Sequence, residues 1–529
     1  MACVGGGPGG LFLGTLLRRA RPDAEVVVFE RNRPDDTFGF GVVFSNATLG
    51  GIHAADPVLT QGLTEYGAHW DEIEVRLHGE RLRCGGNGMA AIRRKTLLAL
   101  LHERAVAAGV ELRFEHEVTD PTALDEYDLV VAADGANSLI RSRFAEHLQP
   151  SVEVASAKFI WFGTPYLFDG LTFVHGSGPD GVFAVHGYPY GREGSTFLVE
   201  TDEASLRRAG LDEFDVAQPP GVSDEKSRTY LEALFAEQID GRPLLTNNSR
   251  WASFRTIRTR TWHHRNVVLL GDAAHTAHFS VGSGTKMAME DAVVLAEALG
   301  EHTDVETALE AYDAGRRPDV EKVQDSARPS LSWWEHFGRY HDSFEPVQFA
   351  FHFLTRSISR GKLARRDPAF VGQIDAWWRR RTGAAPLVAP LEAGGIHLAQ
   401  RALRIHTTAS MPAVPTAEGG LIPLVPAGTP IPAGGFGLWL RAPEAENQLP
   451  PAVRELEDGI AAGAILVAVH GGSRLTRTLL CEEARLLRKT PALMVDETLD
   501  ADGATTVLLS GRADLVGAAP DVVAGWESM

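Results

Sequence analysis

Cysteine is scarce in this chain: Cys3, Cys84 and Cys481 are the only three among 529 residues, and they lie far apart. This scarcity argues against a disulfide-built fold and a cysteine-ligated zinc site, and it favours reduced thiols in a cytoplasmic protein. Long apolar runs are also missing, because no stretch reaches the roughly 18 residues of a membrane span. Glycines interrupt the apolar N-terminus, so we expect neither a signal peptide nor a membrane segment.

Basic residues are outnumbered, because 51 Lys and Arg stand against 69 Asp and Glu and give a formal net charge of −18. Nonspecific binding to nucleic acid needs a positive surface and is therefore not expected. The remaining composition, 44% hydrophobic and 23% charged, is that of an ordinary globular protein. The length predicts several domains of roughly 100–200 residues each.

The hydrophobic pattern changes several times along the chain and predicts an α/β protein. Short buried strands alternate with helices at the N-terminus, whereas alternating aromatic residues near 158–201 indicate an antiparallel sheet. Residues 383–435 are rich in Pro, Gly and Ala with weak periodicity, and they include the low-complexity stretch 409–435. A short α/β pattern follows them. The expected domains are a discontinuous Rossmann-like dinucleotide-binding domain (1–150 and 250–330), an inserted antiparallel substrate-binding domain (151–249), a helical extension (331–382) and a degenerate, barrel-like C-terminal domain (383–529).

A glycine-rich turn lies between the first expected strand and helix. Gly5, Gly7 and Gly10 have the G-x-G-x-x-G spacing that permits a tight turn, close approach of a pyrophosphate and close helix packing. Glu30 follows twenty residues later, at the end of the next strand, where it can bind ribose hydroxyls. The dinucleotide contacts expected here are Gly5, Gly7, Pro8, Gly9, Gly10, Glu30 and Arg31.

Two further strands end in an acidic turn. Asp134 and Gly135 follow the apolar strand at 129–133, and Gly271, Asp272 and Ala273 follow the strand at 267–270. A carboxylate at the end of a buried strand is placed at the rim of the sheet, where Asp272 can hold the ribityl chain of a flavin. Either turn alone could be an ordinary exit from a strand, but the three motifs in this order predict a flavin-binding fold.

With these motifs, residues 1 to about 380 resemble the single-component (class A) flavin-dependent aromatic hydroxylases. The resemblance implies FAD as the cofactor, NADPH or NADH as the reductant, molecular oxygen as a substrate and no metal. It also implies that Arg94 contacts the FAD pyrophosphate and that Asp134 lies near the flavin and nicotinamide sites.

Three segments, 29–32, 39–45 and 275–286, resemble the salicylyl-CoA 5-hydroxylase and 2-aminobenzoyl-CoA monooxygenase branch of this class. His278-Phe279 replaces the proline pair of the wider class and Lys286 replaces its usual asparagine, and both departures fit the branch. In the third segment the resemblance implies further flavin contacts at Gly282, Gly284 and Thr285.

We therefore expect an FAD-dependent monooxygenase that hydroxylates an aromatic ring, carried as a CoA or carrier-protein thioester of a salicylyl or anthraniloyl group. The tryptophan hydroxylase of violacein biosynthesis is also similar, so a free aromatic or indole substrate is the alternative. A third hypothesis is a flavin-binding module without turnover, whose C-terminal domain binds a partner.

Proton transfer from the ring would use histidine or tyrosine side chains near the flavin. In the class, the loop that holds His278 sits over the flavin and the antiparallel sheet forms the wall of the substrate pocket. Alternation along the strand predicts that His186 and Tyr188 share one face. The catalytic candidates are His278, His186, Tyr188, His175 and Trp161, and each could instead be plain core.

The C-terminal segment contains sequences around 387–398 and 510–516 that resemble the opening and closing strands of Old Yellow Enzyme-type barrels. About 145 residues remain here, against roughly 250 in a complete eightfold barrel. We expect a vestigial barrel without FMN and without a second activity, retained for packing or for contacts in a homodimer. His470 follows a strand of this segment, but its presumed catalytic partners are missing.

Overall fold

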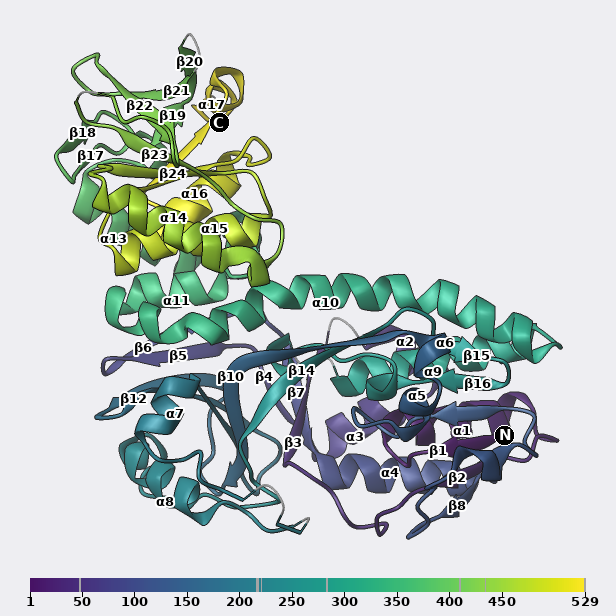
Figure 1. The fold of residues 1–529 in the computed structure, drawn as a ribbon. Helices are drawn as coiled ribbons and strands as arrows, with labels where there is room; N and C mark the ends of the chain where they lie inside the picture. The colour runs from purple at the N-terminus through teal and green to yellow at the C-terminus, as the bar shows by residue number, and fades with distance from the viewer. Residues whose placement is uncertain are drawn as a thin grey trace. The chain divides into compact units, whose positions relative to one another are not determined.

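The computed structural model describes residues 1–46, 49–215, 218–219, 221–281, 284–408, 411–432 and 434–527. These residues form two compact units, Met1–Glu335 and His336–Met529, and the division falls within helix α10 (Val305–Ser343). Figure 1 labels the elements of both units. Within the described part of the chain, no helix is both long enough and apolar enough to cross a membrane.

The first unit contains a six-stranded sheet in the order β15-β16-β9-β1-β2-β8. Its strands run parallel except for β15, and the apolar strands β1, β2, β9 and β16 are buried throughout, as expected when helices cover a parallel sheet. Helix α1 packs against α4 and α9, and these helices share one hydrophobic core with the sheet. The bounds are β1 (Ala2–Val4), α1 (Pro8–Ala20), β2 (Val27–Phe29), α4 (Arg94–Ala107), β8 (Glu111–Arg113), β9 (Val130–Ala132), β15 (His263–His264), β16 (Val267–Leu269) and α9 (Gly284–Glu301).

A seven-stranded sheet in the order β14-β10-β13-β12-β11-β5-β6 lies beside it in the same unit. All of its pairs are antiparallel except β5 with β11, which confirms the predicted inserted antiparallel sheet. The bounds are β5 (Ile73–Leu77), β6 (Glu80–Cys84), β10 (Pro150–Thr164), β11 (Leu171–Gly178), β12 (Gly181–Pro189), β13 (Ser195–Thr201) and β14 (Ala252–Thr259).

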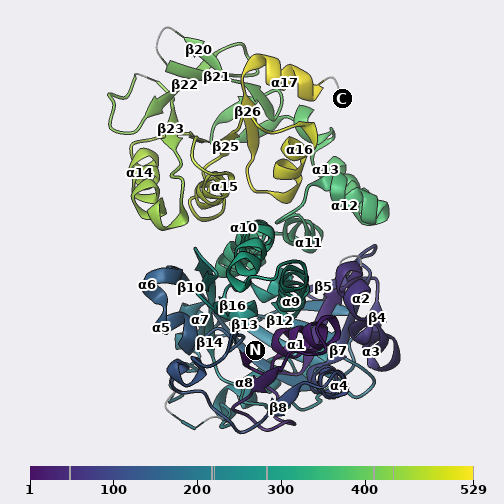
Figure 2. The same cartoon turned by 90° about the vertical axis from the view of Figure 1, so that its right-hand side faces the viewer.

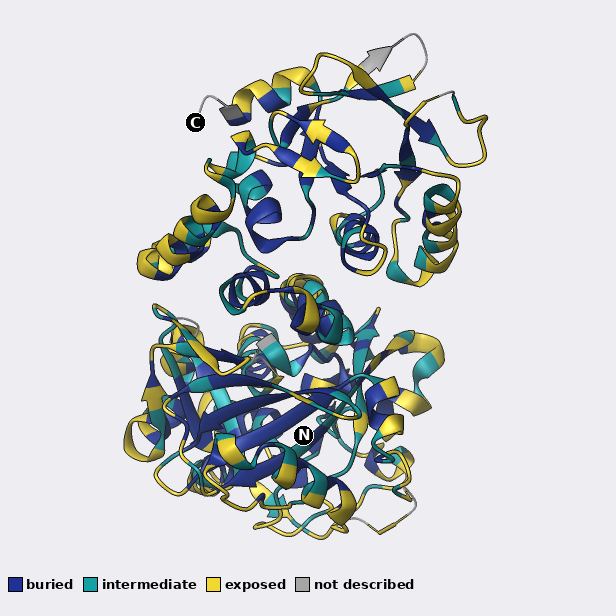
Figure 3. Cartoon of the chain, turned by 90° about the vertical axis from the view of Figure 1, so that its left-hand side faces the viewer, coloured by how far each residue is buried: buried dark blue, intermediate teal, exposed yellow. Residues whose placement is uncertain are grey.

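The alternation along these strands separates two faces. Ile160, Val185 and Val199 belong to an apolar cluster that also includes side chains of α7 (Glu203–Arg208) and α8 (Glu225–Leu234). The residues that alternate with them along each strand point to the opposite face, which is rich in histidine and aromatic side chains. Figure 3 shows the strands of this sheet as mostly buried.

A small antiparallel sheet, β3-β7-β4, and several short helices complete the first unit. Their bounds are β3 (Gly41–Ser45), α2 (Gly50–Ala55), α3 (Val58–Tyr66), β4 (Ala68–Trp70), β7 (Met89–Arg93), η2 (Pro121–Leu124), α5 (Leu139–Arg143), α6 (Ala145–Leu148), η3 (Ala236–Ile239), η4 (Gly271–Ala273) and η5 (Phe279–Val281).

The second unit is built around an eight-stranded sheet in the order β19-β26-β25-β24-β23-β22-β21-β20. The strands from β19 to β22 along this order run parallel, and β20 and β21 are antiparallel. In Figure 2, helices α14, α15 and α16 lie on one side of these strands. The strand bounds are β19 (Ala402–Arg404), β20 (His406–Thr408), β21 (Met411–Pro415), β22 (Leu421–Pro426), β23 (Gly437–Arg441), β24 (Leu466–His470), β25 (Ala492–Val495) and β26 (Leu515–Ala518).

This sheet nearly closes on itself. Only Ile405 separates β19 from β20, yet β19 pairs with β26 at one end of the order and β20 pairs with β21 at the other. The result is a small barrel-like sheet, as predicted. The other elements of the unit are α11 (Pro346–Leu354), α12 (Arg360–Arg366), α13 (Pro368–Thr382), η6 (Pro386–Val388), β17 (Leu391–Ala393), β18 (Ile396–Leu398), η7 (Glu446–Gln448), α14 (Leu449–Ala461), α15 (Arg474–Glu482), the π-helical turn η8 (Glu483–Leu487), α16 (Ala501–Ser510) and α17 (Pro520–Glu527).

Two strands of this sheet lie in the low-complexity stretch. The stretch 409–435 has weak periodicity in the sequence, but its described residues include strands β21 and β22, which complete the sheet. Val414 and Leu424 are fully buried there because pairing with neighbouring strands supplies the order that local composition does not.

Candidate active site

The glycine-rich turn after β1 has the geometry that a bound pyrophosphate requires. Gly5 has φ +115°, and a Cβ there would lie 2.1 Å from the carbonyl oxygen of Ala133. At Gly10 an added Cβ would lie 2.3 Å from the oxygen of Gly5, whereas at Gly7 no described atom lies within 4 Å. Gly7 precedes α1, whose first amides have no side-chain cap. The turn is therefore tight on the protein side and open toward a ligand.

Glu30 lies at the end of β2, beside this turn. One carboxylate oxygen accepts a hydrogen bond from the Gly6 amide at 2.8 Å, and the other accepts from the backbone and side chain of Asn32. Arg31 is exposed next to it. This holds the carboxylate at the edge of the sheet where the ribose of a dinucleotide is bound.

Asp134 follows β9, the strand that pairs with β1 on the other side. Its Oδ2 accepts from the amides of Leu139 and Ile140, whereas its Oδ1 is buried without a hydrogen-bond partner among the described residues. The nearby Arg141 donates to the carbonyl oxygens of Ala136 and Ala273, so it joins the second acidic turn to the third.

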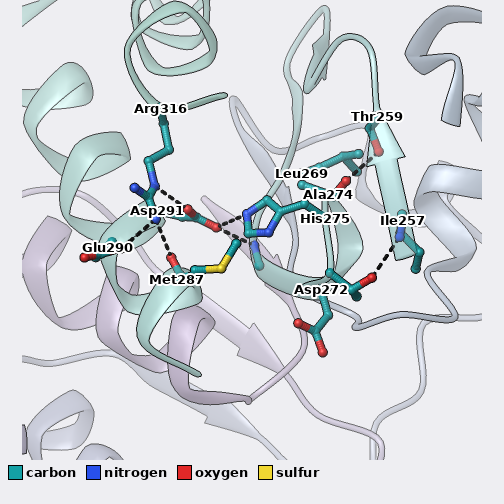
Figure 4. Close-up of polar contacts among 12 residues, drawn as sticks. Ile257, Thr259, Leu269, Asp272, Ala274, His275, Met287, Glu290, Asp291 and Arg316 are labelled. Atoms are coloured by element: carbon teal, nitrogen blue, oxygen red, sulfur yellow. Dashed lines mark hydrogen bonds and ion pairs between the residues drawn. The ribbon is translucent and has the colours of Figure 1, made fainter. Parts of the chain in front are cut away.

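The third turn, Gly271–Ala273, is fixed by a buried ionic network (Figure 4). Asp291 on α9 accepts from the Gly271 amide at 3.0 Å and from Arg316 Nε at 2.7 Å, and its Oδ2 lies 2.7 Å from His275 Nε2. His275 is 3% exposed and packs on Trp262, so its position is structural.

Asp272 points away from that network, as Figure 4 shows, and is exposed. Desolvation of the carboxylate by the surrounding protein raises its pKa above the usual value, and the charges of His275 and Arg94 offset part of this effect. Arg94 begins α4, and burial lowers its pKa while Asp272 and Tyr188 counteract this. The Arg94 amide donates to the Phe40 carbonyl oxygen, but its guanidinium has no hydrogen-bond partner among the described residues and can bind an anion beside Asp272.

These side chains converge because β1, β2, β9 and β16 are parallel neighbours whose carboxyl ends meet at one edge of the sheet. Four features of this edge fit a bound FAD: the open space at Gly7, the uncapped start of α1, the unpaired Asp134 oxygen and the guanidinium of Arg94. Gly284 and Thr285 begin α9, and an added Cβ at Gly284 would lie 4.0 Å from Asp272 Oδ1. Gly282 lies outside the described residues.

The expected catalytic side chains on the antiparallel sheet share one face. His186 and Tyr188 are two residues apart on β12, and the register places Leu198 of β13 opposite His186 and Phe173 of β11 beside it. Tyr188 donates its hydroxyl proton to the carbonyl oxygen of Gly41 at 3.0 Å, and burial raises its pKa to about 12. Its hydroxyl is therefore held by the backbone of β3.

The candidates His175, His186 and Trp161 pack against aromatic rings. His175 and His186 both pack against Trp334, at ring-centroid distances of 6.1 and 4.4 Å. Trp161 on β10 contacts Phe279, which also contacts His186 at 5.7 Å. The structure thus brings Trp161, His186 and the loop around Phe279 together.

His278 lies in that loop, between η4 and η5, and is 2% exposed. The preceding residues are held by β14 and α10: Thr276 exchanges hydrogen bonds with Ile257, and Gln324 donates to both of their carbonyl oxygens. His278 Nε2 lies 3.4 Å from Oε1 of Glu200, a residue of β13 that the sequence reasoning missed. The available signal was a lone acid at an alternating position of the otherwise uncharged strand 195–201.

The mouth of the second unit's sheet has different chemistry. His470, at the end of β24, stacks on Trp439 at 4.2 Å, and the carboxylate of Asp496 binds Arg477 at 2.6 Å. Both oxygens of Glu497 accept from the Ala519 amide, at the start of α17. Across the described residues of the chain, no group of three or more His, Cys, Asp or Glu side chains is arranged to hold a metal ion.

Comparisons with known proteins agree with this geometry. Residues 1–327 match the family of FAD binding domains. The chain is 61% identical over 520 residues to a salicyloyl-CoA 5-hydroxylase of a Streptomyces species, covering 98% of this chain and 99% of that protein. It is 39% identical over 330 residues to the 3-hydroxy-4-methyl-anthranilyl-(aryl-carrier protein) 5-monooxygenase of Streptosporangium sibiricum, covering 62% and 87% of the two chains.

Among solved structures, p-nitrophenol 4-monooxygenase of Pseudomonas putida matches 72% of this chain and 97% of its own, with a TM-score of 0.54 and 19% identity, which shows a shared fold. The family match covers more than half of the sequence, and the dinucleotide-binding turns assemble at one edge of the sheet. The chain therefore belongs to the family of FAD binding domains and is an FAD-dependent aromatic monooxygenase.

Proposed function

We propose that this enzyme hydroxylates the aromatic ring of an aryl thioester, with a salicylyl-CoA type of substrate as the first choice and a carrier-protein thioester as the second. The observation that carries the proposal is the 61% identity to salicyloyl-CoA 5-hydroxylase, because it extends over nearly all of both chains and includes the second unit. The relative that acts on an anthranilyl group bound to an aryl-carrier protein supports the thioester class.

FAD, when bound, supplies the activated oxygen that is transferred to the ring. Overall, the ring, molecular oxygen, NADH or NADPH and one proton give the hydroxylated ring, oxidised nicotinamide and water. The cofactor-binding residues that we propose are Gly5, Gly7, Pro8, Gly9, Gly10, Glu30, Arg31, Arg94, Asp134, Gly271, Asp272, Ala273, Gly282, Gly284 and Thr285.

The protein's own task is to hold a planar ring away from water. Trp161 and Phe279, together with Phe159 of β10, form an aromatic wall, and Phe159 meets Phe279 at 5.0 Å. Such a wall packs on an aromatic substrate and excludes water from the reacting atoms. His186 and His278 stand at this wall, and we propose that they accept the proton of a ring hydroxyl. Trp161, His175 and Tyr188 shape the pocket.

The decisive experiment is a substrate panel with the purified holoenzyme. Salicylyl-CoA, anthraniloyl-CoA, the corresponding free acids and tryptophan are each tested for NAD(P)H oxidation, oxygen uptake and product mass. The expected result is hydroxylated product from a CoA thioester and little from the free acids. Efficient hydroxylation of a free acid or of an indole would refute the thioester proposal.

A free aromatic substrate is the second candidate. The protodeoxyviolaceinate monooxygenase of Chromobacterium violaceum is 31% identical over 338 residues, which cover 63% of this chain. This similarity is lower and covers less of the chain than the 61% identity over 98% of it to salicyloyl-CoA 5-hydroxylase, so it favours the second candidate less than the thioester.

For the second unit we propose no FMN site and no separate activity, with a role in packing or in a homodimer. In barrel enzymes a phosphate commonly binds at the loops after the last strands and at the start of a short extra helix. Here the carboxylate of Glu497 accepts hydrogen bonds from the Ala519 amide at that position, and its negative charge would repel a phosphate, which supports the proposal.

The three free, buried cysteines support a reducing compartment such as the cytoplasm.

A further inference from the structure

A buried carboxylate lies between the two histidines of the proposed pocket. His186 Nε2 lies 2.7 Å from Oε2 of Glu200, and His278 Nε2 lies 3.4 Å from the other oxygen, Oε1. The side chains of all three residues are 6% exposed or less. Each oxygen of one carboxylate therefore faces a different imidazole, although the two histidines are 92 residues apart in the sequence.

The fold imposes this arrangement. On β13, Glu200 pairs with Ala184 of β12 and Phe159 of β10, so its side chain rises on the face that also carries His186. The loop that carries His278 is anchored by β14 and α10, as described above. A glutamate at this position cannot reach solvent without leaving the sheet.

A buried carboxylate without partners would be strongly destabilising. Burial raises the pKa of Glu200, but the neighbouring imidazoles of His186 and His278 lower it more, and the net pKa lies below the usual value. Glu200 is thus ionised at neutral pH. The other titratable side chains on this face of β11 to β13 are His175 and Tyr188. The uncharged rings of Trp334 on α10 and Phe254 on β14 pack against His186 and His278, respectively.

The contacts of His278 also define its tautomer. Its Nε2 faces the carboxylate, so this nitrogen carries the proton. Its Nδ1 lies 2.7 Å from Ser280 Oγ, which in turn lies 2.7 Å from Ser330 Oγ of α10. Ser280 is only partly buried, so this row of hydroxyls connects the buried carboxylate with the half-exposed loop.

We propose that Glu200 is a positioning residue, which fixes the orientation of His186 and His278 and neutralises the positive charge that forms when one of them accepts the proton of a substrate hydroxyl. In this step the ring O–H bond breaks, an N–H bond forms on one imidazole, and Glu200 stays ionised. A carboxylate in this role resembles the acid of a catalytic triad, which orients a histidine without itself taking the proton. The inference rests on the proposed function and narrows it to a ring with an ionisable hydroxyl, such as a salicylyl group.

The test measures the ionisation of the bound phenol without turnover. Salicylyl-CoA is added to the FAD-loaded enzyme in the absence of NAD(P)H, and the phenolate absorption is followed by difference spectroscopy across pH. In the native enzyme the bound phenol is expected to ionise at lower pH than free salicylyl-CoA. In Glu200→Gln the ionisation constant is expected to fall at least tenfold, and in Glu200→Asp it should fall less because the charge is kept.

Glu203→Gln is the matched control, because it removes one negative charge three residues away on an exposed side chain of α7. FAD content and thermal unfolding are recorded for every variant, and E203Q should match the native enzyme throughout. If E200Q does not retain FAD, E200D decides, with an expected shift of at least threefold in the ionisation constant.

The outcomes separate the two levels of the proposal. A native enzyme that neither binds salicylyl-CoA nor oxidises NAD(P)H in response to any aryl thioester overturns the proposed function and this inference with it. A native enzyme that does both, while E200Q (or E200D, where E200Q lacks FAD) ionises the bound phenol at the same pH, overturns only the assignment of Glu200.

Discussion

Gly5 and Gly7 lie in the same turn but are constrained by different partners. Gly5 is required by the protein itself, because its positive φ and the nearby Ala133 oxygen leave no room for a side chain. Gly7 has φ −75° and ψ 176°, which any residue can adopt, and no described atom lies near its missing Cβ. We infer that Gly7 is glycine for the sake of the ligand.

Gly7→Ala is therefore expected to unfold at nearly the same temperature as the native apoprotein but to bind FAD at least about tenfold more weakly, about 1.4 kcal/mol. Gly5→Ala should lower the stability of the apoprotein by about 3 kcal/mol or more, with or without flavin. Thermal unfolding of the apoproteins and FAD titration distinguish the two effects. Equal FAD affinity in G7A and the native protein would contradict this account.

His352 in the second unit gives a residue-scale prediction about pH. It is fully buried, 3.1 Å from the carboxylate of Glu482, and burial together with the charge of Arg512 lowers its pKa to about 4. The unfolded chain binds this proton near pH 6.5. The folded form therefore loses stability as the pH falls from about 6.5 toward 4, by about 3 kcal/mol in total.

His352→Gln should flatten the pH dependence of urea unfolding between pH 6.5 and 4.5, even though it lowers stability at neutral pH. His397→Gln, which changes an exposed histidine of the same unit, is the control and should keep the native slope. Identical slopes for H352Q and the native chain would show that His352 does not cause the dependence.

At the scale of elements, the turn η4 that carries Asp272 depends on Asp291 of α9 and Arg316 of α10, two residues that are not among the proposed flavin contacts. Asp291 of α9 and Arg316 of α10 form a buried pair, and Asp291 also holds the Gly271 amide and His275. Removing one partner of such a pair leaves an uncompensated buried charge, which typically costs about 3–5 kcal/mol.

Arg316→Met is accordingly expected to destabilise the first unit by about 3 kcal/mol and to release FAD at a lower temperature, because the turn carrying Asp272 is no longer held. Lys322→Met on the same helix removes an exposed ion pair with Asp319 and should change stability by less than about 0.5 kcal/mol. Calorimetry with flavin fluorescence measures both quantities. Native-like FAD release in R316M would disprove the coupling.

The pattern of each element was readable in the sequence to different degrees. Alternation in 182–188 and 195–201 predicted strands and placed His186 and Tyr188 on one face, as the register confirms. Strands β21 and β22 were not recognisable, because their local composition carries no clear period and their order comes from pairing with neighbours.

For the whole molecule, the prediction is that FAD is its only flavin. Flavin extracted from the purified protein should consist of about one FAD per chain, without FMN. Glu497→Gln removes the negative charge at the start of α17, and we still expect no FMN to bind, because the sheet keeps the buried Arg477–Asp496 pair at the same mouth. Chromatography of the extracted flavin measures this, and stoichiometric FMN would require a second redox site.

The sequence by itself determined the flavin-binding class. Gly5, Glu30, Asp134 and Asp272 stand directly after strands, and the parallel order of those strands is what any α/β sheet of this kind imposes. It also determined that His186 and Tyr188 share one face of their strand, since a period of two assigns faces without further information.

Only the tertiary structure decided what lies against what. It showed that Glu200 faces both His186 and His278, that Tyr188 is held by Gly41, and that His275 contacts Asp291. These contacts join segments that are far apart in the chain. Their geometry depends on the register of strands and the anchoring of one loop, which no local pattern of residues specifies.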